Sequence, residues 1–197
     1  MCEYSKEEIV KRVIDEVLNV VAYIHKRHRW MFECSYHETT IVDALHHYFS
    51  RTDFCRGLEQ DGIKCCNELS RSKTGNKLDP TDPNKTRTIR IDFCLHKPDH
   101  GDRNILVIEF KKRDKNGRID AGRLKRDENK VKELSLPEDN SGYVRNYWCG
   151  ISAIIDKDMV DFKCYTRGFV DSELTKTYRY RNGRFALSEK FKRATDD

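Results

Sequence analysis

The first regular pattern along the chain is an apolar stripe at helical spacing near its N-terminus. The stripe consists of Val10, Val13, Ile14, Val17, Val21 and Ile24. Apolar residues that recur every three or four positions line one face of a helix. Ser5 and Glu8 give the S-x-x-E pattern of a capping box. We therefore expect a helix over about residues 5–30, which either covers the core or pairs with a second subunit in a homodimer.

A second helix is expected over about residues 35–50. Its apolar stripe consists of Ile41, Val42, Leu45 and Phe49. Ser35 and Glu38 repeat the S-x-x-E pattern, and Glu38 lies on the same face as the stripe, one turn before it. Glu38 therefore has two compatible interpretations: it caps its own helix, and it points into a functional site.

The segment 87–112 has the pattern of two strands joined by a polar turn. Residues 105–108 are all apolar, which is typical of a central strand covered on both faces. Glu109 and Lys111 follow on one face, because alternate residues of a strand share a side. Charges at the end of a core strand are costly to bury unless another group compensates them.

The register of this hairpin brings two acids together. If the turn centres on residues 100 and 101, Asp92 lies directly opposite Glu109. Two like charges in that arrangement destabilise a sheet, so the pair predicts a cation beside it. The cation is either a metal ion or a basic side chain, Arg90 or Lys111, in a purely structural network.

Asp92, followed by Glu109-Phe110-Lys111 at the end of an apolar strand, resembles the PD-(D/E)XK nuclease superfamily, over about residues 36–166. Pro98-Asp99 also precedes the E-x-K triplet, but Pro-Asp is ordinary turn chemistry and we assign it to the turn. The resemblance implies a restriction-endonuclease-like α/β fold, a mixed sheet flanked by helices. The N-terminal helix and a C-terminal hairpin would be additions to that fold.

The chemistry that the resemblance implies is metal-dependent hydrolysis of phosphodiester bonds in nucleic acid, with DNA as the expected substrate. Asp92, Glu109 and the main-chain carbonyl of Phe110 would hold Mg²⁺ or Mn²⁺, since hard cations prefer oxygen ligands. Glu38 would contribute to metal binding, with Glu68 as the alternative third acid. Lys111 would orient or deprotonate the attacking water and stabilise charge on the phosphate.

The most basic part of the chain follows this motif. Between Lys111 and Lys132 there are ten lysines or arginines and four acids, a net charge of +6 where the whole chain carries +5. A helix is expected over about residues 120–134, with Asp127 and Lys130 in a D-x-x-K pattern found in some of these nucleases. A charge run is usually a solvated face, but its position favours phosphate contacts. The expected contacts are Lys112, Arg123, Lys125, Arg126 and Lys130.

The remaining elements complete an α/β pattern. Strands are expected over about residues 63–69, 147–155 and 159–165, a hairpin over 177–187, and loops over 71–87 and 137–142. The hairpin is centred on Asn182-Gly183, a strong turn signal. The whole chain is expected to form a single domain, with C-terminal strands over about residues 159–188.

Composition narrows the class of protein. The 197 residues are 37% hydrophobic and 36% charged, and no apolar run has the length of a membrane span or the pattern of a signal peptide. We therefore expect a cytoplasmic protein with no membrane partner, in which the eight cysteines are reduced thiols. A zinc site is the alternative for some of them, although no C-x-x-C spacing supports it. It would use Cys55, Cys65, Cys66, His46 and His47.

Two other functions compete with the nuclease. One is a catalytically inactive nuclease-fold protein that binds nucleic acid or acts in assembly. The other is an interaction module whose basic helix binds an acidic protein. The complete Asp, Glu and Lys set favours the enzyme.

Overall fold

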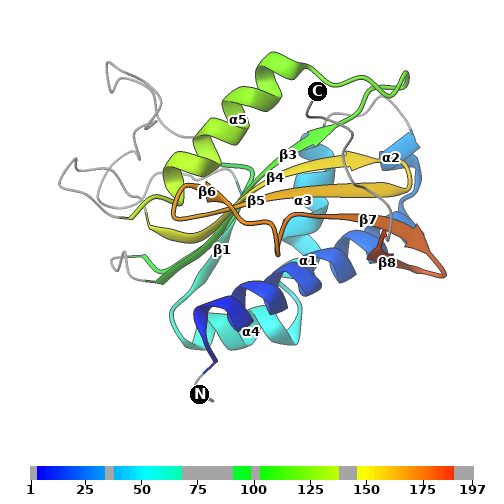
Figure 1. Cartoon of the computed structure of the whole chain (residues 1–197). Helices are drawn as coiled ribbons and strands as arrows, with labels where there is room; N and C mark the ends of the chain where they lie inside the picture. The colour runs from blue at the N-terminus through cyan, green and yellow to red at the C-terminus, as the bar shows by residue number, and fades with distance from the viewer. Residues whose placement is uncertain (1–3, 34–37, 68–90, 99–102, 138–145, 189–197) are drawn as a thin grey trace.

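The computed structural model describes residues 4–33, 38–67, 91–98, 103–137 and 146–188 (Figure 1). Within these residues the chain forms five helices and one sheet of eight strands. The helices are α1 (Lys6–Arg27), α2 (Trp30–Glu33), α3 (Glu38–Phe49), α4 (Asp53–Gln60) and α5 (Ala121–Leu134). The strands are β1 (Lys64–Cys66), β2 (Phe93–His96), β3 (Asn104–Lys112), β4 (Tyr147–Asp156), β5 (Met159–Thr166), β6 (Phe169–Val170), β7 (Lys176–Arg181) and β8 (Arg184–Leu187).

The sheet is mixed. Its strand order is β1-β2-β3-β4-β5-β7-β8, with β6 paired to β5. The central pair, β3 and β4, is parallel, and α5 provides the crossover between them. All the other pairs are antiparallel. The expected class, an α/β protein with a mixed sheet flanked by helices, is confirmed.

Helices cover both faces of the sheet (Figure 1). On one face α1 and α3 pack against alternate residues of β3, Leu106, Ile108 and Phe110, in the larger of two apolar cores. On the other face Val131 and Leu134 of α5 pack with Val107 in a smaller core. The strand β3 is therefore buried from both sides, as its uninterrupted apolar run predicts.

Local signals account for the ends of the helices. Ser5 and Glu8 form the expected capping box, in which the Ser5 amide donates to Glu8 at 2.7 Å and the Glu8 amide to Ser5 at 3.2 Å. The α1 stripe lies on the core. At the start of α5 the Asp120 side chain accepts a hydrogen bond from the Arg123 amide at 2.9 Å.

The expected elements over residues 147–155 and 159–165 and the hairpin at 177–187 are confirmed as β4, β5 and the β7–β8 pair. The helix α4 is absent from the predicted elements; it begins after a Thr52 cap and contains Gly57 in its interior. A helix of eight residues with a glycine has weak periodicity, so its local signal is poor. Residues 71–87, 99–102 and 138–142 lie outside the described residues, as do Ser35, Glu68 and Arg90.

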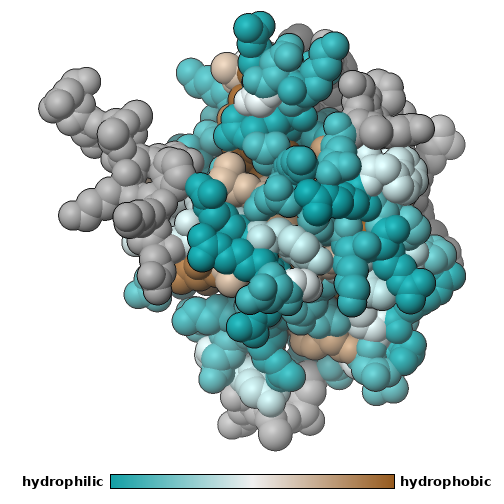
Figure 2. All heavy atoms as spheres, turned by 90° about the vertical axis from the view of Figure 1, so that its right-hand side faces the viewer, coloured by the Kyte–Doolittle hydropathy of each residue, from teal (hydrophilic) through white to brown (hydrophobic). Residues whose placement is uncertain are grey.

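The face that carries α2 and the β7–β8 hairpin is covered mainly by hydrophilic side chains (Figure 2). No helix within the described residues is both long enough and apolar enough to cross a membrane.

Candidate active site

Asp92 and Glu109 meet where β2 begins and β3 ends. Phe93 lies opposite Ile108, and continuing this register by one residue places Asp92 opposite Glu109. The Asp92 carboxylate accepts a hydrogen bond from the Phe110 amide at 2.8 Å. The register expected from the hairpin is thus confirmed, and the two acids lie side by side on neighbouring antiparallel strands.

Glu109 is a carboxylate in an unfavourable environment. Only 3% of the residue is exposed, and burial, together with the negative charge of Asp92, raises the pKa of Glu109 to about 8. Its Oε2 atom lies 2.8 Å from the Lys130 ammonium. Its Oε1 atom is buried and accepts no hydrogen bond from any described residue. Burial also raises the pKa of Asp92, despite the hydrogen bond from the Phe110 amide.

Lys111 joins three elements at the end of β3. Its Nζ atom lies 2.8 Å from Glu38 at the start of α3 and 2.9 Å from Asp127 of α5, and it donates to the Phe110 carbonyl at 3.0 Å. Burial acts to lower the pKa of Lys111, but the hydrogen bonds with Glu38 and Asp127 outweigh burial and raise it. Lys111 is therefore firmly protonated at neutral pH.

The inward face of α5 supplies charges as well as apolar contacts. Asp127 and Lys130 lie on the same face as Val131 and Leu134, because residues three, four and seven apart share a side of a helix. Lys130 bonds Glu109 and also lies 3.6 Å from Asp127. In the sequence, only the weak D-x-x-K pattern indicated that Asp127 and Lys130 belong to the site.

Lys130 was expected to contact nucleic acid, but the structure places its ammonium group at Glu109. With 15% of its side chain exposed, Lys130 faces the buried acids and not the solvent, since the same face of α5 packs on the sheet. Lys125 and Arg126 are exposed, as is Arg123, which pairs with Asp120. Lys112 is partly buried and donates to the Met31 carbonyl at 2.6 Å.

The charges at this site do not balance. Glu38, Asp92, Glu109 and Asp127 provide four carboxylates, and two ammonium groups, Lys111 and Lys130, contact three of them, Glu38, Glu109 and Asp127. If all these groups ionise, these contacts leave two negative charges in excess in a region of low dielectric. Burial first, and then the negative charge of Asp92, raise the pKa of Glu109 in this environment.

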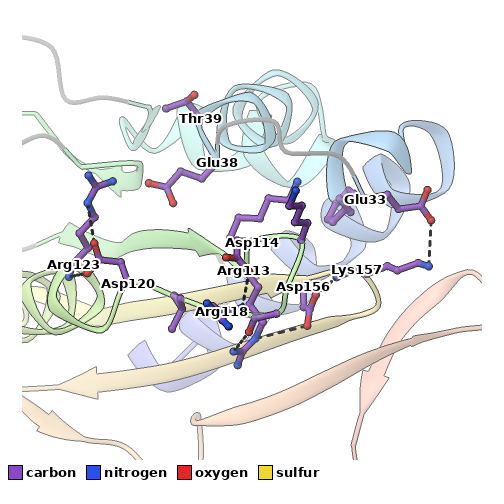
Figure 3. A pocket seen from close by; sticks show the side chains of 15 residues that line it. Glu33, Glu38, Thr39, Arg113, Asp114, Arg118, Asp120, Arg123, Asp156 and Lys157 are labelled. Atoms are coloured by element: carbon purple, nitrogen blue, oxygen red, sulfur yellow. Dashed lines mark hydrogen bonds and ion pairs between the residues drawn. The ribbon is translucent and has the colours of Figure 1, made fainter.

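A cleft of about 970 Å³ opens next to the ion pairs. Glu38 and Thr39 line it from the start of α3, and Asp120 and Arg123 from the start of α5 (Figure 3). The segment after β3 supplies Arg113, Lys115 and Arg118 among other residues. Glu38 belongs both to this cleft and to the Lys111 contacts, so it connects the cleft to the buried acids.

The donor set for a metal ion is small. No group of three or more His, Cys, Asp and Glu side chains is placed to hold a metal ion in the part of the chain that the structure describes, and this includes the five residues of the zinc alternative. Asp92, Glu109 and the Phe110 carbonyl are adjacent oxygen donors. The buried, unpartnered Oε1 atom of Glu109 fits a hard cation that completes its coordination with water.

No known protein family, curated protein or solved structure that was compared with this chain matches it. The chemistry of the site therefore rests on its own geometry.

Proposed function

We propose that the protein is a metal-dependent nuclease with a restriction-endonuclease-like fold. The observation that carries this proposal is the buried Glu109 carboxylate, which lies beside Asp92, has a raised pKa and leaves one oxygen without a hydrogen bond. A bound divalent cation would compensate the two excess negative charges. The Asp, Glu and Lys residues around this point are those of the PD-(D/E)XK resemblance.

Asp92, Glu109 and the Phe110 carbonyl would hold Mg²⁺ or Mn²⁺. When bound, the ion would activate water and neutralise charge on the phosphodiester. The hydrogen bond from the Phe110 amide of β3 fixes the orientation of Asp92, so that this ligand is held in place before the metal binds.

Lys111 supports the reaction as a cation. Because its pKa is raised, it is a poor general base at neutral pH, and its ammonium group instead donates to the phosphate as charge develops. Glu38 and Asp127 hold this ammonium group at the end of β3. This assigns Glu38 a positioning role through Lys111, whereas the PD-(D/E)XK resemblance implies a contribution of Glu38 to metal binding.

The cleft would receive the nucleic acid. Lys115 and Arg118 line it and form no ion pair with any other described side chain, so they are suited to contact phosphates. Lys125 and Arg126 extend the basic surface along the exposed side of α5. Phosphate contacts of this kind would give affinity without sequence preference.

A second function is favoured by one observation. Lys130 already bonds Glu109, and Lys111 already bonds two acids, so the ion pairs could serve structure alone in an inactive protein that binds nucleic acid. In the enzyme the Lys130–Glu109 contact has to loosen when the metal binds. The two functions therefore differ in their response to divalent metal.

The deciding experiment is incubation with single-stranded and double-stranded DNA and RNA, with Mg²⁺ or Mn²⁺ and with EDTA. The nuclease cleaves at least one substrate only with metal, and Asp92→Asn and Lys111→Ala abolish the cleavage. Binding that persists in EDTA, with no cleavage in either metal, would establish the inactive protein instead.

A further inference from the structure

A group of sulfur and imidazole side chains lies at the β1 edge of the sheet, and the proposed hydrolysis uses none of them. Cys66 of β1 is directly opposite Cys94 of β2. Residues opposite each other in an antiparallel pair have Cα atoms about 4.5–5.5 Å apart, with both side chains on one face. That separation is within the range that a disulfide bond requires, about 4.4–6.8 Å.

His96 is the third member of the group. Its Nε2 atom lies 3.4 Å from the Cys66 sulfur. His96 and Cys94 are buried, whereas Cys66 is partly exposed. The group thus has one cysteine that is partly exposed, one buried cysteine opposite it and an imidazole in contact with the partly exposed one.

The electrostatics distinguish Cys66 from its neighbour. Hydrogen bonds from Cys94 and His96 lower the pKa of the Cys66 thiol well below its ordinary value. Cys65, with a similar degree of exposure, has its pKa raised by the hydrogen bond with Cys55 and by burial. Adjacent cysteines of one strand therefore differ in how readily they form the thiolate, which is the nucleophile.

We propose that Cys66 is an oxidation site, which reacts with a hydroperoxide and then forms a reversible disulfide with Cys94. The Cys66 thiolate attacks one oxygen of hydrogen peroxide, so that an S–O bond forms and the O–O bond breaks. The released hydroxide takes a proton and leaves as water, while Cys66 is oxidised by two electrons to a sulfenic acid.

The second step uses the opposite strand. The Cys94 sulfur attacks the Cys66 sulfur, so that the S–S bond forms and the S–O bond breaks. The Cys94 proton and the hydroxyl group leave together as water, and an external dithiol later reduces the disulfide by two electrons. His96 donates to the Cys66 sulfur in its thiolate form and keeps it ionised.

The first test is competitive alkylation with iodoacetamide at neutral pH, followed by mass spectrometry. Trypsin leaves Cys65 and Cys66 together in the peptide of residues 65–71, so fragmentation between them locates the label. We expect Cys66 to react roughly tenfold or more faster than Cys65. His96→Gln should remove most of this difference, with a melting curve to verify the fold. Equal labelling of the two cysteines in the wild type would overturn the proposal.

The second test is treatment with hydrogen peroxide. The expected product links the peptide of residues 65–71 to that of residues 91–103 through Cys66 and Cys94, and dithiothreitol reverses it. In Cys94→Ser the link is lost and dimedone traps a sulfenic acid at Cys66. Cys55→Ser is the matched control, because it removes another buried thiol and should leave the link intact. Links confined to other cysteines, or no sulfenic acid in Cys94→Ser, would contradict the assignment.

Discussion

Glu109 is a carboxylic acid whose ionisation the fold opposes strongly. Its pKa rises from an ordinary value of about 4.5 to about 8, so the folded protein holds a proton that the unfolded chain has released between these pH values. The contribution of this proton to the free energy of unfolding is present in full below the ordinary pKa of Glu109. It is lost as the pH rises through the raised pKa of the folded state. The raised pKa of Asp92 acts in the same direction.

We therefore expect the metal-free protein to become less stable between about pH 5 and pH 8, on the order of 4 kcal/mol or roughly 10 °C in Tm. Glu109→Gln keeps the shape and removes the ionisation, so its Tm should vary much less over this range. Thermal unfolding in EDTA, monitored by circular dichroism, measures both curves. If the two proteins show the same pH dependence, Glu109 is not the group responsible.

Glu38 is the residue that joins the cleft to Lys111. Glu38→Gln removes the charge that faces the ammonium group, so we expect cleavage to fall by roughly tenfold or more through misplacement of Lys111. The loss of stability should be below about 1 kcal/mol, because the ion pair is partly exposed and Asp127 still bonds Lys111.

The matched control is Glu33→Gln. Glu33 lines the same cleft but pairs with Arg29 and Lys157, so its loss should leave cleavage nearly unchanged. If Glu38→Gln is as active as the wild type, Glu38 only caps its own helix and does not position Lys111 for the reaction.

At the scale of elements, α5 has two different functions on its two sides. Its inward side supplies Asp127 and Lys130 to the site, and its outward side exposes Lys125 and Arg126. Replacement of both exposed residues by Gln should weaken nucleic-acid binding and reduce the slope of log affinity against log salt by about two on double-stranded DNA, since each phosphate contact releases about one counterion.

Arg181→Gln with Arg184→Gln is the control for this charge change. Both residues are exposed on the β7–β8 hairpin, away from α5 (Figure 1). Fluorescence anisotropy over a range of salt concentrations gives the slopes. Equal slopes in the two double variants would leave α5 as a solvated face with no part in binding.

The contact between α5 and β4 depends on a glycine. A Cβ atom added at Gly150 would lie 2.3 Å from the Val131 carbonyl oxygen, a main-chain atom that moves only with the helix. Gly150→Ala should therefore cost roughly 2 kcal/mol of stability by overpacking. Gly57→Ala in α4 is the control, because nothing lies within 4 Å of its added methyl group and alanine favours a helix. Chemical denaturation compares the two, and an unaltered midpoint in Gly150→Ala would mean that α5 packs less closely than described.

At the scale of the whole molecule, metal binding should stabilise the fold by linkage. A cation that binds only the folded state raises Tm as its concentration increases. We expect Mg²⁺ or Mn²⁺ to raise the Tm of the wild type and of Lys111→Ala, since an ammonium group is no metal ligand. Asp92→Asn should lose this rise, and its metal-free Tm should equal or exceed that of the wild type, because repulsion from Glu109 is removed.

Differential scanning calorimetry with and without metal provides the comparison. The purely structural ion-pair network would show no metal-dependent rise in any of the three proteins. A rise in Asp92→Asn equal to that of the wild type would show that Asp92 is not a ligand.

The sequence predicted those parts of the fold that local chemistry controls. The capping box at Ser5 and Glu8, the apolar stripe of α1, the run in β3 and the Asn182-Gly183 turn are short-range signals, and each specified its element. The pairing of Asp92 with Glu109 also followed from the sequence, since one register fixes every pair in a hairpin. The helix α4 was missed because eight residues with a central glycine carry little periodic signal.

Contacts between distant elements were decided by the tertiary structure alone. In the sequence Lys130 is one base among ten in a basic segment, and only the packing of α5 on the sheet directs it to Glu109. The contact of Lys111 with Glu38 joins residues 73 positions apart, and that of Cys66 with His96 joins residues 30 apart. Such pairs depend on how helices pack against strands, or on which strands pair, and the pattern of a single segment encodes neither. The sequence therefore determined which residues could carry the chemistry and that Asp92 meets Glu109, whereas the packing of α3 and α5 brought Glu38, Asp127 and Lys130 to Lys111 and Glu109.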